Sequence, residues 1–183
     1  MKNRMTKREI FEWIKAIVLA VLIVFGIRYF LFIPVAVSGE SMMPTLNNGD
    51  HMIINKIGDI KRFDIIVFHA TEDEDYIKRV IGLPGDHIEY KDDVLYINGK
   101  AYEEPYLDDF KEALLDDGFL TESFTLEETP VASETVPEGH VFVMGDNRRY
   151  SKDSRMIGAV PMSEIVGKTK LKFWPIHDFQ ITK

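Results

Sequence analysis

The longest apolar stretch of the chain lies near its N-terminus. Residues 16–37 read AIVLAVLIVFGIRYFLFIPVAV, and Arg28 is the only charged residue among them. About 20 mostly apolar residues suffice for a helix to cross the hydrocarbon core of a bilayer. Arg28 stands toward one end of the run, where its long stem can carry the charge to the headgroups, and Pro34 is expected to end the helix. The pattern therefore predicts one transmembrane helix over residues 16–37.

Basic residues precede this run, namely Lys2, Arg4, Lys7, Arg8 and Lys15. The positive-inside rule then predicts that residues 1–15 form a cytoplasmic tail and that residues 38–183 lie outside the plasma membrane. A cleaved secretory signal is the alternative, because it also joins a basic start to an apolar core, but that core usually has about 7 to 15 residues. Ala36-Val37-Ser38 is a passable cleavage site, and we expect slow self-cleavage there.

Short β-type segments separated by turns make up most of the remaining chain. They are Asp64 to His69, Tyr76 to Ile81, His87 to Tyr90, Val94 to Ile97, His140 to Met144 and Ile165 to Trp174. Pro84-Gly85 and Asn98-Gly99 are turn dipeptides, since glycine accepts a positive φ and proline presets its own φ. This even spacing predicts a mostly β fold, with an antiparallel sheet following the N-terminal helix.

An acidic segment interrupts this β pattern. Residues 108–128 read DDFKEALLDDGFLTESFTLEE, a composition that suits an exposed insertion better than a core strand. Leu114 and Leu115 are expected to give it one helical turn. We therefore expect a small inserted cap region over about residues 87–136.

Composition excludes several classes of protein. The chain has 183 residues, a formal net charge of −8 and no cysteine. No basic stripe follows the first fifteen positions, so a nucleic-acid partner is not expected. Without cysteine the chain can form neither disulfides nor thiolate zinc sites, and it has no cysteine nucleophile. The absence of cysteine fits both reducing and oxidising compartments.

Two residues have the potential for nucleophilic catalysis. Ser41 lies in a Gly/Pro-rich stretch directly after the apolar run, and Lys78 lies in the apolar segment YIKRVIGLPGD. A serine hydroxyl needs a neighbouring base, and a lysine acts as a base near pH 7 only if its pKa falls from about 10.4. Burial can lower it by up to 3 to 5 units. Taken singly, a turn serine and a lysine that reaches solvent from a strand edge remain the simpler interpretations.

A third motif changes this weighing. Residues 143–161 read VMGDNRRYSKDSRMIGAVP, a Gly-Asp turn followed by a dense polar run. Together SGESMMPT, YIKRVIGLPGD and GDNRRYSKDSR resemble the signature boxes of type I signal peptidases in order and rough spacing, and the single anchor resembles the Gram-positive, Bacillus-type branch. The resemblance implies a membrane-anchored serine endopeptidase that cuts signal peptides from exported preproteins.

The resemblance also implies roles for individual residues. Ser41 is the expected nucleophile and Lys78 the general base, while Ser151 should hydrogen-bond and orient Lys78. The expected supporting network consists of Asp146, Asp153, Arg155 and Arg79. On a strand Arg79 points away from the face that Tyr76, Lys78 and Val80 share, and its expected partner is Asp146.

Substrate binding follows the same resemblance. An extended peptide is expected to add to exposed strands, with its small Ala-x-Ala residues in shallow pockets. Met42 and Ile77 are candidate pocket walls, although a core role is an equal alternative. The Ser41 backbone N–H is the expected oxyanion donor. Some relatives carry a second serine two residues before the nucleophile, where this chain has Gly39, so a contribution from Ser38 is doubtful.

Other mechanisms find less support in the sequence. None of the five histidines, His51, His69, His87, His140 and His177, stands in a hydrolase motif, and no G-x-S-x-G surrounds Ser41. No H-E-x-x-H or similar zinc-ligand spacing is present. We expect no metal, no cofactor and a monomer, with signal peptides and the lipid bilayer as partners. A catalytically silent anchored module that binds extracellular peptides is the alternative from another class.

Overall fold

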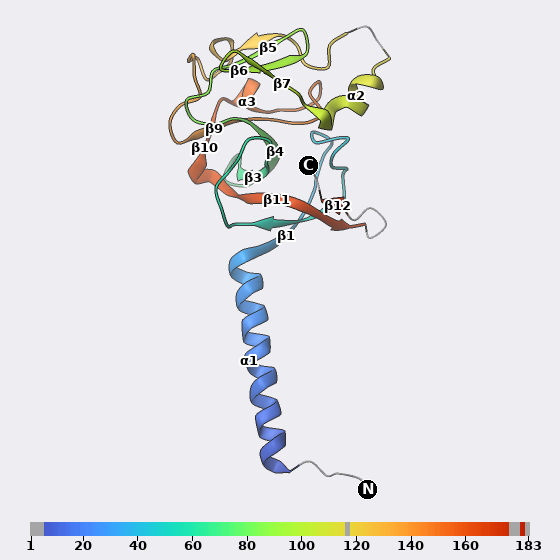
Figure 1. Cartoon of the computed structure of the whole chain (residues 1–183), viewed down its shortest axis with the longest axis vertical. Coiled ribbons are helices and arrows are strands. Elements are labelled where there is room, and N and C mark those ends of the chain that lie inside the picture. The colour runs from blue at the N-terminus through green and yellow to red at the C-terminus, as the bar shows by residue number, and fades with distance from the viewer. Residues whose placement is uncertain (1–5, 116–117, 176–179, 182–183) are drawn as a thin grey trace.

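The computed structural model describes residues 6–115, 118–175 and 180–181, with the backbone alone at residues 27–32, 170 and 180–181. A long helix, α1 (Lys7–Leu31), extends from one end of a mostly β domain (Figure 1). Antiparallel pairing connects the strands throughout. The expected fold class, an N-terminal helix followed by an antiparallel β domain, is therefore the one observed.

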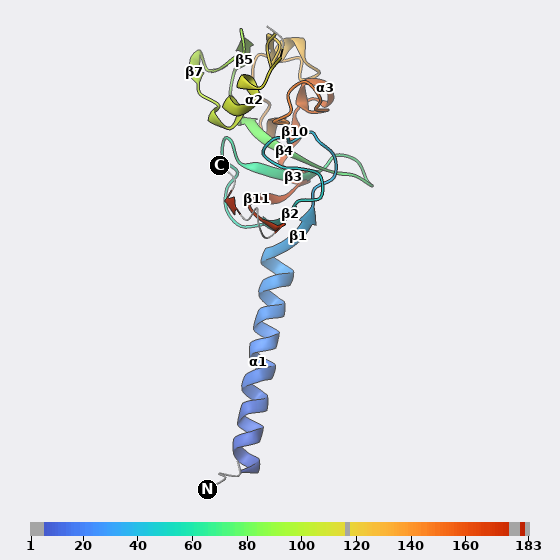
Figure 2. The same ribbon diagram turned by 90° about the vertical axis from the view of Figure 1, so that its right-hand side faces the viewer.

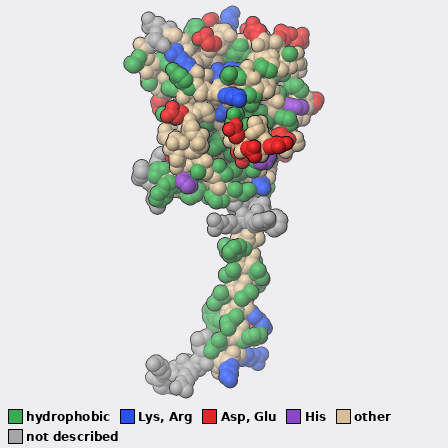
Figure 3. Space-filling view, turned by 180° about the vertical axis from the view of Figure 1, so that it is seen from behind, with side chains coloured by type: hydrophobic (Ala, Val, Ile, Leu, Met, Phe, Trp, Pro, Cys, Tyr) green, Lys and Arg blue, Asp and Glu red, His purple; other side chains and the backbone are tan. Residues whose placement is uncertain are grey.

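Helix α1 extends away from the β domain and joins it at β1 (Figures 1 and 2). Its N-terminus is capped reciprocally, since Glu9 N donates to Thr6 Oγ1 and Thr6 N donates to Glu9 Oε2. Apolar side chains such as Trp13, Leu22 and Phe25 are exposed. Figure 3 shows hydrophobic side chains along the helix and Lys and Arg side chains toward its N-terminal end. Among the described residues, no helix combines the length and apolarity needed to cross a membrane.

The helix does not extend to the end of the predicted span 16–37. It ends at Leu31, and β1 (Phe32–Ala36) pairs antiparallel with β2 (His51–Asn55). Pro34 lies within β1, and proline is compatible with β structure when the strand is at the edge of a sheet, as β1 is. The expected end of the helix at Pro34 is close to the observed end at Leu31, but the apolar run did not reveal that residues 32–36 of the span form a strand paired with β2.

The main sheet of the described residues has the order β1-β2-β11-β3-β4-β9-β10, and β12 pairs with β11. Its further strands are β3 (Ile65–His69), β4 (Asp75–Gly82), β9 (His140–Met144), β10 (Val160–Pro161), β11 (Ile165–Trp174) and β12 (Gln180–Ile181). The short helices η3 (Met162–Glu164) and α3 (Ser154–Ile157) connect strands at its end. The predicted segments correspond to β3, β4, β9 and β11 to within one residue at each end.

A second sheet lies at the end of the domain away from α1, as Figures 1 and 2 agree. Its order is β7-β6-β5-β8, with β5 (Ile88–Lys91), β6 (Val94–Ile97), β7 (Lys100–Tyr102) and β8 (Phe124–Thr125). Helices η1 (Pro105–Leu107), α2 (Asp108–Glu112) and η2 (Leu126–Glu128) complete this region. The predicted turn at Leu114 and Leu115 forms earlier, as α2, where Asp108 and Asp109 occupy the first helical turn and complement the helix dipole.

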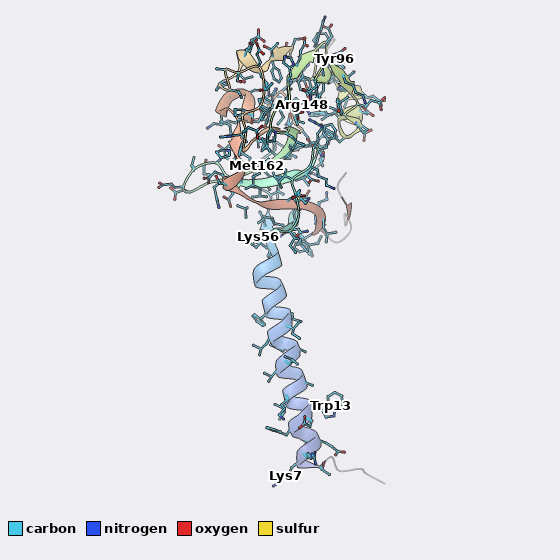
Figure 4. All side chains as sticks on the ribbon, turned by 60° about the vertical axis from the view of Figure 1, so that its left-hand side comes forward. Lys7, Trp13, Lys56, Tyr96, Arg148 and Met162 are labelled. Carbon is cyan, nitrogen blue, oxygen red and sulfur yellow. The ribbon has the colours of Figure 1, made fainter. Side chains whose placement is uncertain are left out.

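A buried arginine joins the second sheet to the rest of the domain. Arg148 lies between the two sheets, below Tyr96 and above Met162 in Figure 4. Its guanidinium donates to Glu104 Oε1 at 2.6 Å, to Tyr90 Oη at 2.8 Å and to Thr121 Oγ1 at 3.1 Å. Although burial alone would raise it, the pKa of Glu104 is lowered because the charge of Arg148 and the hydrogen bonds that Arg148, Tyr106 and Tyr90 donate to the carboxylate favour its ionised form. The inserted region 87–136, which contains Glu104, is thus fixed to the domain by a buried ion pair.

Central strand β11 requires a glycine where it passes between β2 and β3. A Cβ atom at Gly167 would lie 2.6 Å from Ile54 Cγ2 and 2.7 Å from the Asn55 carbonyl oxygen. The Asn55 oxygen belongs to paired backbone and cannot give way cheaply. A side chain at this position therefore forces the strands apart.

We expect Gly167→Ala to lower the free energy of unfolding by about 1 to 3 kcal/mol, the usual range for overpacking. Thermal unfolding of the full chain in detergent measures it. Gly26→Ala adds the same methyl group where no atom lies within 4 Å, so it is the matched control. Equal melting temperatures for the two variants would contradict the close approach.

Candidate active site

The loop that carries Ser41 is closed by a backbone hydrogen bond and packs on an apolar cluster. Val37 N donates to the Asp50 carbonyl oxygen at 2.8 Å, which brings the two ends of the loop together. Met42 and Leu46 are buried in one apolar cluster with Val37. Burial of these side chains leaves Ser41 on the outer side of the loop, where it is partly accessible.

Lys78 is the buried partner of this serine. Its side chain is buried, with a relative exposure of 4% for the residue, and its Nζ atom lies 2.7 Å from Ser41 Oγ and 3.0 Å from the Ile77 carbonyl oxygen. Burial lowers the pKa of Lys78 from the usual 10.5 to about 8, although Asp153 and Asp146 act in the opposite direction. A lysine with this pKa is partly neutral near physiological pH, and a neutral amine can accept a proton.

The neighbouring residue on the opposite face of β4 makes a buried ion pair. Arg79 donates from Nε to Asp146 Oδ1 at 2.8 Å and from Nη2 to Asp146 Oδ2 at 2.6 Å. Thr45, in the loop of Ser41, donates its hydroxyl to the same carboxylate. Asp146 therefore holds together the strand that carries Lys78 and the loop that carries Ser41.

The third box packs directly on the loop of Ser41 at Gly145. A Cβ atom there would overlap the side chain of Ser151 and the carbonyl oxygen of Ser41. Asn147 N donates to that Ser41 oxygen at 3.0 Å, and Asn147 Nδ2 donates to the Glu40 carbonyl oxygen at 3.1 Å. These contacts thus fix the peptide units before and after Ser41.

Ser151 lies in this contact but does not make the predicted hydrogen bond to Lys78. Its Oγ is buried and has no hydrogen-bond partner within the described part of the chain. Lys78 Nζ instead contacts Ser41 Oγ and the Ile77 carbonyl oxygen. The prediction of a Ser151 bond to Lys78 was therefore wrong for this arrangement, because the amine has turned toward its own strand.

Asp153 and Arg155 form a second ion pair behind the site. Arg155 donates to Asp153 from Nε at 2.9 Å and from Nη2 at 2.8 Å. Asp153 also accepts from Gly145 N at 3.0 Å, and Arg155 Nη2 donates to the Arg148 carbonyl oxygen at 2.7 Å. The pair therefore fixes the turn around Gly145 and Arg148 and does not itself contact Ser41.

Four residues that the sequence analysis did not single out complete the site: Thr45, Gly145, Asn147 and Arg148. All four lie inside the first or third box. Only their contacts identify them, because polar residues and glycine in a turn-rich segment are otherwise typical of surface loops.

A groove with a volume of about 340 Å³ runs beside Ser41 and Lys78. Strands β1 and β4 supply two of its walls, and Met42 and Ile77 line it as predicted pocket walls, although Met42 is also part of the core. Strand β1 is the last of the sheet, and β4 pairs with β9 only from Arg79 onward. Both strands thus present unpaired backbone toward the groove.

The Ala36-Val37-Ser38 segment is itself part of this groove. Ala36, in β1, pairs with His51 of β2, and buried Val37 donates a backbone hydrogen bond to Asp50. Self-cleavage at this segment, as expected from the sequence, would require β1 to separate from β2.

Histidines and metal ligands were the alternatives to this dyad. His69 Nδ1 lies 2.6 Å from Asp75 Oδ1, and no histidine hydrogen-bonds to Ser41 within the described ranges; His177 lies outside them. The described residues contain no group of His, Asp and Glu side chains that could hold a metal ion. The nearest basic group to Ser41 Oγ is the Lys78 amine.

Sequence and structure comparisons agree on one family. A family model described as "Signal peptidase, peptidase S26" matches residues 10–174. The chain is 54% identical over 164 residues to signal peptidase I of Bacillus caldolyticus, covering 87% of this chain and 89% of the relative. It is 43% identical over 182 residues to signal peptidase IB of Staphylococcus aureus strain COL, covering 95% and 94%.

A solved structure supports the same relationship. The crystal structure of a signal peptidase I from Enterococcus faecalis V583 superposes with a TM-score of 0.59 at 44% sequence identity, covering 62% of this chain and 98% of that one. The resemblance drawn from the three boxes is thereby confirmed. The chain therefore belongs to the signal peptidase I family of serine endopeptidases.

Proposed function

We propose that this serine peptidase removes signal peptides from exported preproteins with Ser41 as nucleophile and neutral Lys78 as general base, cutting after small Ala-x-Ala residues. The observation that carries the proposal is the buried Lys78 Nζ atom, 2.7 Å from Ser41 Oγ. A serine and a base within hydrogen-bond distance are what nucleophilic catalysis requires. The buried ion pairs around them keep this contact in place.

The reaction follows from these two groups. Neutral Lys78 accepts the hydroxyl proton while Ser41 Oγ attacks the carbonyl carbon of the peptide bond. The ammonium group then donates this proton to the leaving amine, and the signal peptide remains as an ester on Ser41. Lys78 next activates the water that hydrolyses the ester.

The tetrahedral intermediate needs hydrogen-bond donors for its oxyanion. The backbone N–H of Ser41 donates to no described group and lies beside the groove, so we assign this role to it. Ser38 is exposed and also lines the groove, but it stands three residues before the nucleophile. We assign no role to its hydroxyl.

The unpaired edges of β1 and β4 support binding of an extended peptide. Such a peptide can hydrogen-bond to both strands, while its alternate side chains point toward the groove walls. The walls near Ser41 include Met42 and Ile77, and both pack in the same apolar cluster. Shallow apolar pockets at this place favour alanine over larger or charged side chains.

We further propose that α1 attaches the enzyme to the plasma membrane, with residues 1–15 in the cytoplasm. The support comes from the apolar side chains that α1 exposes from Ile10 to Phe25 and from the basic residues at its start. An exposed apolar helix of this kind is unfavourable in water. Attachment at this end leaves the groove beside β1 near the membrane surface, where a signal peptide arrives.

Replacing either member of the dyad tests the catalytic proposal. We expect Ser41→Ala and Lys78→Ala each to lower the rate of precursor cleavage by at least about a thousandfold, as the loss of members of a catalytic unit does. Gel analysis of a signal-peptide-bearing precursor measures it, and Ser163→Ala, at an exposed position, is the control. Cleavage by Ser41→Ala at the original rate would favour the silent peptide-binding module instead.

The pKa of Lys78 predicts how activity depends on pH. The base is active when neutral, so kcat/KM should rise with pH, about tenfold per unit below pH 8, and level off above the pKa of about 8. A pH series with a small-residue peptide substrate measures this profile. A histidine base would instead give a midpoint near 6.5, and histidine-directed reagents would then abolish activity.

Asp146 should be required for both stability and activity. Asp146→Asn leaves the Arg79 guanidinium buried without a counter-charge, and breaking such a pair costs about 3 to 5 kcal/mol. We expect a matching drop in the free energy of unfolding and a loss of cleavage at temperatures where the variant is still folded. Asp73→Asn removes an exposed carboxylate and is the control. Unchanged stability of Asp146→Asn would refute this role.

A further inference from the structure

The segment Tyr150–Lys152 of the third box presents two side chains to the groove. Ser151 points inward against Gly145, and its two neighbours are exposed. Tyr150 has a relative exposure of 80%, which is high for a large aromatic residue. Tyr150 and Lys152 both line the groove beside Ser41. None of the roles described above uses these two side chains.

The register of β4 and β9 locates this segment along a bound peptide. Met144 pairs with Arg79, so Gly145 stands level with Lys78, and Ser151 packs on Gly145. The open edge of β4 therefore ends at Lys78. A signal peptide that pairs with residues 75–78 of β4 therefore reaches the third box at the bond to be cut. The mature chain that follows this bond must then pass over Tyr150 and Lys152.

Lys152 is available for a charge in the substrate. It forms no hydrogen bond or ion pair with any residue in the described part of the chain. Asp75, which also lines the groove, is paired with His69. Glu40, next to Ser41, lines the groove as well, so its lining carries charges of both signs.

We propose that Lys152, together with Tyr150, contacts the first residues of the mature chain and favours an acidic side chain there. The inference rests on the proposed function, since it assumes that a precursor occupies the groove. Lys152 supplies the charge and Tyr150 a flat apolar surface for the same segment. Both act as specificity residues on the side of the leaving amine.

The test compares precursors that differ only in carrying Glu or Lys at one of the first three mature positions. The native enzyme and Lys152→Glu are each assayed for kcat/KM. An exposed ion pair is worth about two- to fivefold in a rate or binding constant. The native enzyme can pair with the Glu precursor and Lys152→Glu with the Lys precursor, so this factor applies twice. We therefore expect the ratio of kcat/KM for the Glu precursor to that for the Lys precursor to fall by the square of the factor in Lys152→Glu. Lys152→Gln should lie between the two, and roughly 0.5 M salt should shrink the differences.

Lys91→Glu makes the same charge change on the second sheet, at an exposed position outside the groove, and should leave the ratio unchanged. The inference is overturned if Lys152→Glu gives the native ratio at all three positions while cleavage still depends on Ser41. A native enzyme that cleaves none of the precursors would overturn the proposed function, and this inference with it. Melting temperatures show whether Lys152→Glu is folded.

Discussion

The carboxylate of Asp146 joins the two segments whose side chains must meet. It binds Arg79, the neighbour of Lys78 on β4, and it accepts a hydrogen bond from Thr45 in the loop of Ser41. Both partners of the ion pair are fully buried. In such surroundings the charges interact strongly, and their geometry is specified by direct bidentate contact. Asp146 thus contributes directly to the short distance between Ser41 and Lys78.

Burial of Lys78 is unfavourable for folding and necessary for the proposed chemistry. Desolvation disfavours the ammonium form, which is why its pKa falls. Within the described ranges no carboxylate hydrogen-bonds to the amine, because Asp146 binds Arg79 and Asp153 binds Arg155. A direct ion pair would keep the lysine charged. Asp153 and Asp146 still favour the ammonium form electrostatically, but burial has the larger effect on the pKa of Lys78.

The second sheet contributes to the site through the same buried polar network. The guanidinium of Arg79 lies 3.8 Å from the ring centroid of Tyr106, and Tyr106 donates its hydroxyl to Glu104, the partner of Arg148. Arg148 in turn offers its carbonyl oxygen to Arg155. Contacts therefore continue from the inserted region 87–136 to both ion pairs of the site. The inserted region thus supports the turn around Gly145 and Arg148.

The sequence by itself determined much of this protein. Short β-type segments between turn residues predicted β3, β4, β9 and β11 nearly to the residue, because both features are local properties of the sequence. The three boxes indicated the family and predicted Ser41, Lys78 and Asp146 as site residues. Tertiary structure alone decided that residues 32–36 join a sheet, since their partner β2 is distant in sequence. It alone revealed the buried Arg148 cluster and the orientation of Ser151, because side-chain contacts between distant segments leave no periodic signal along the chain.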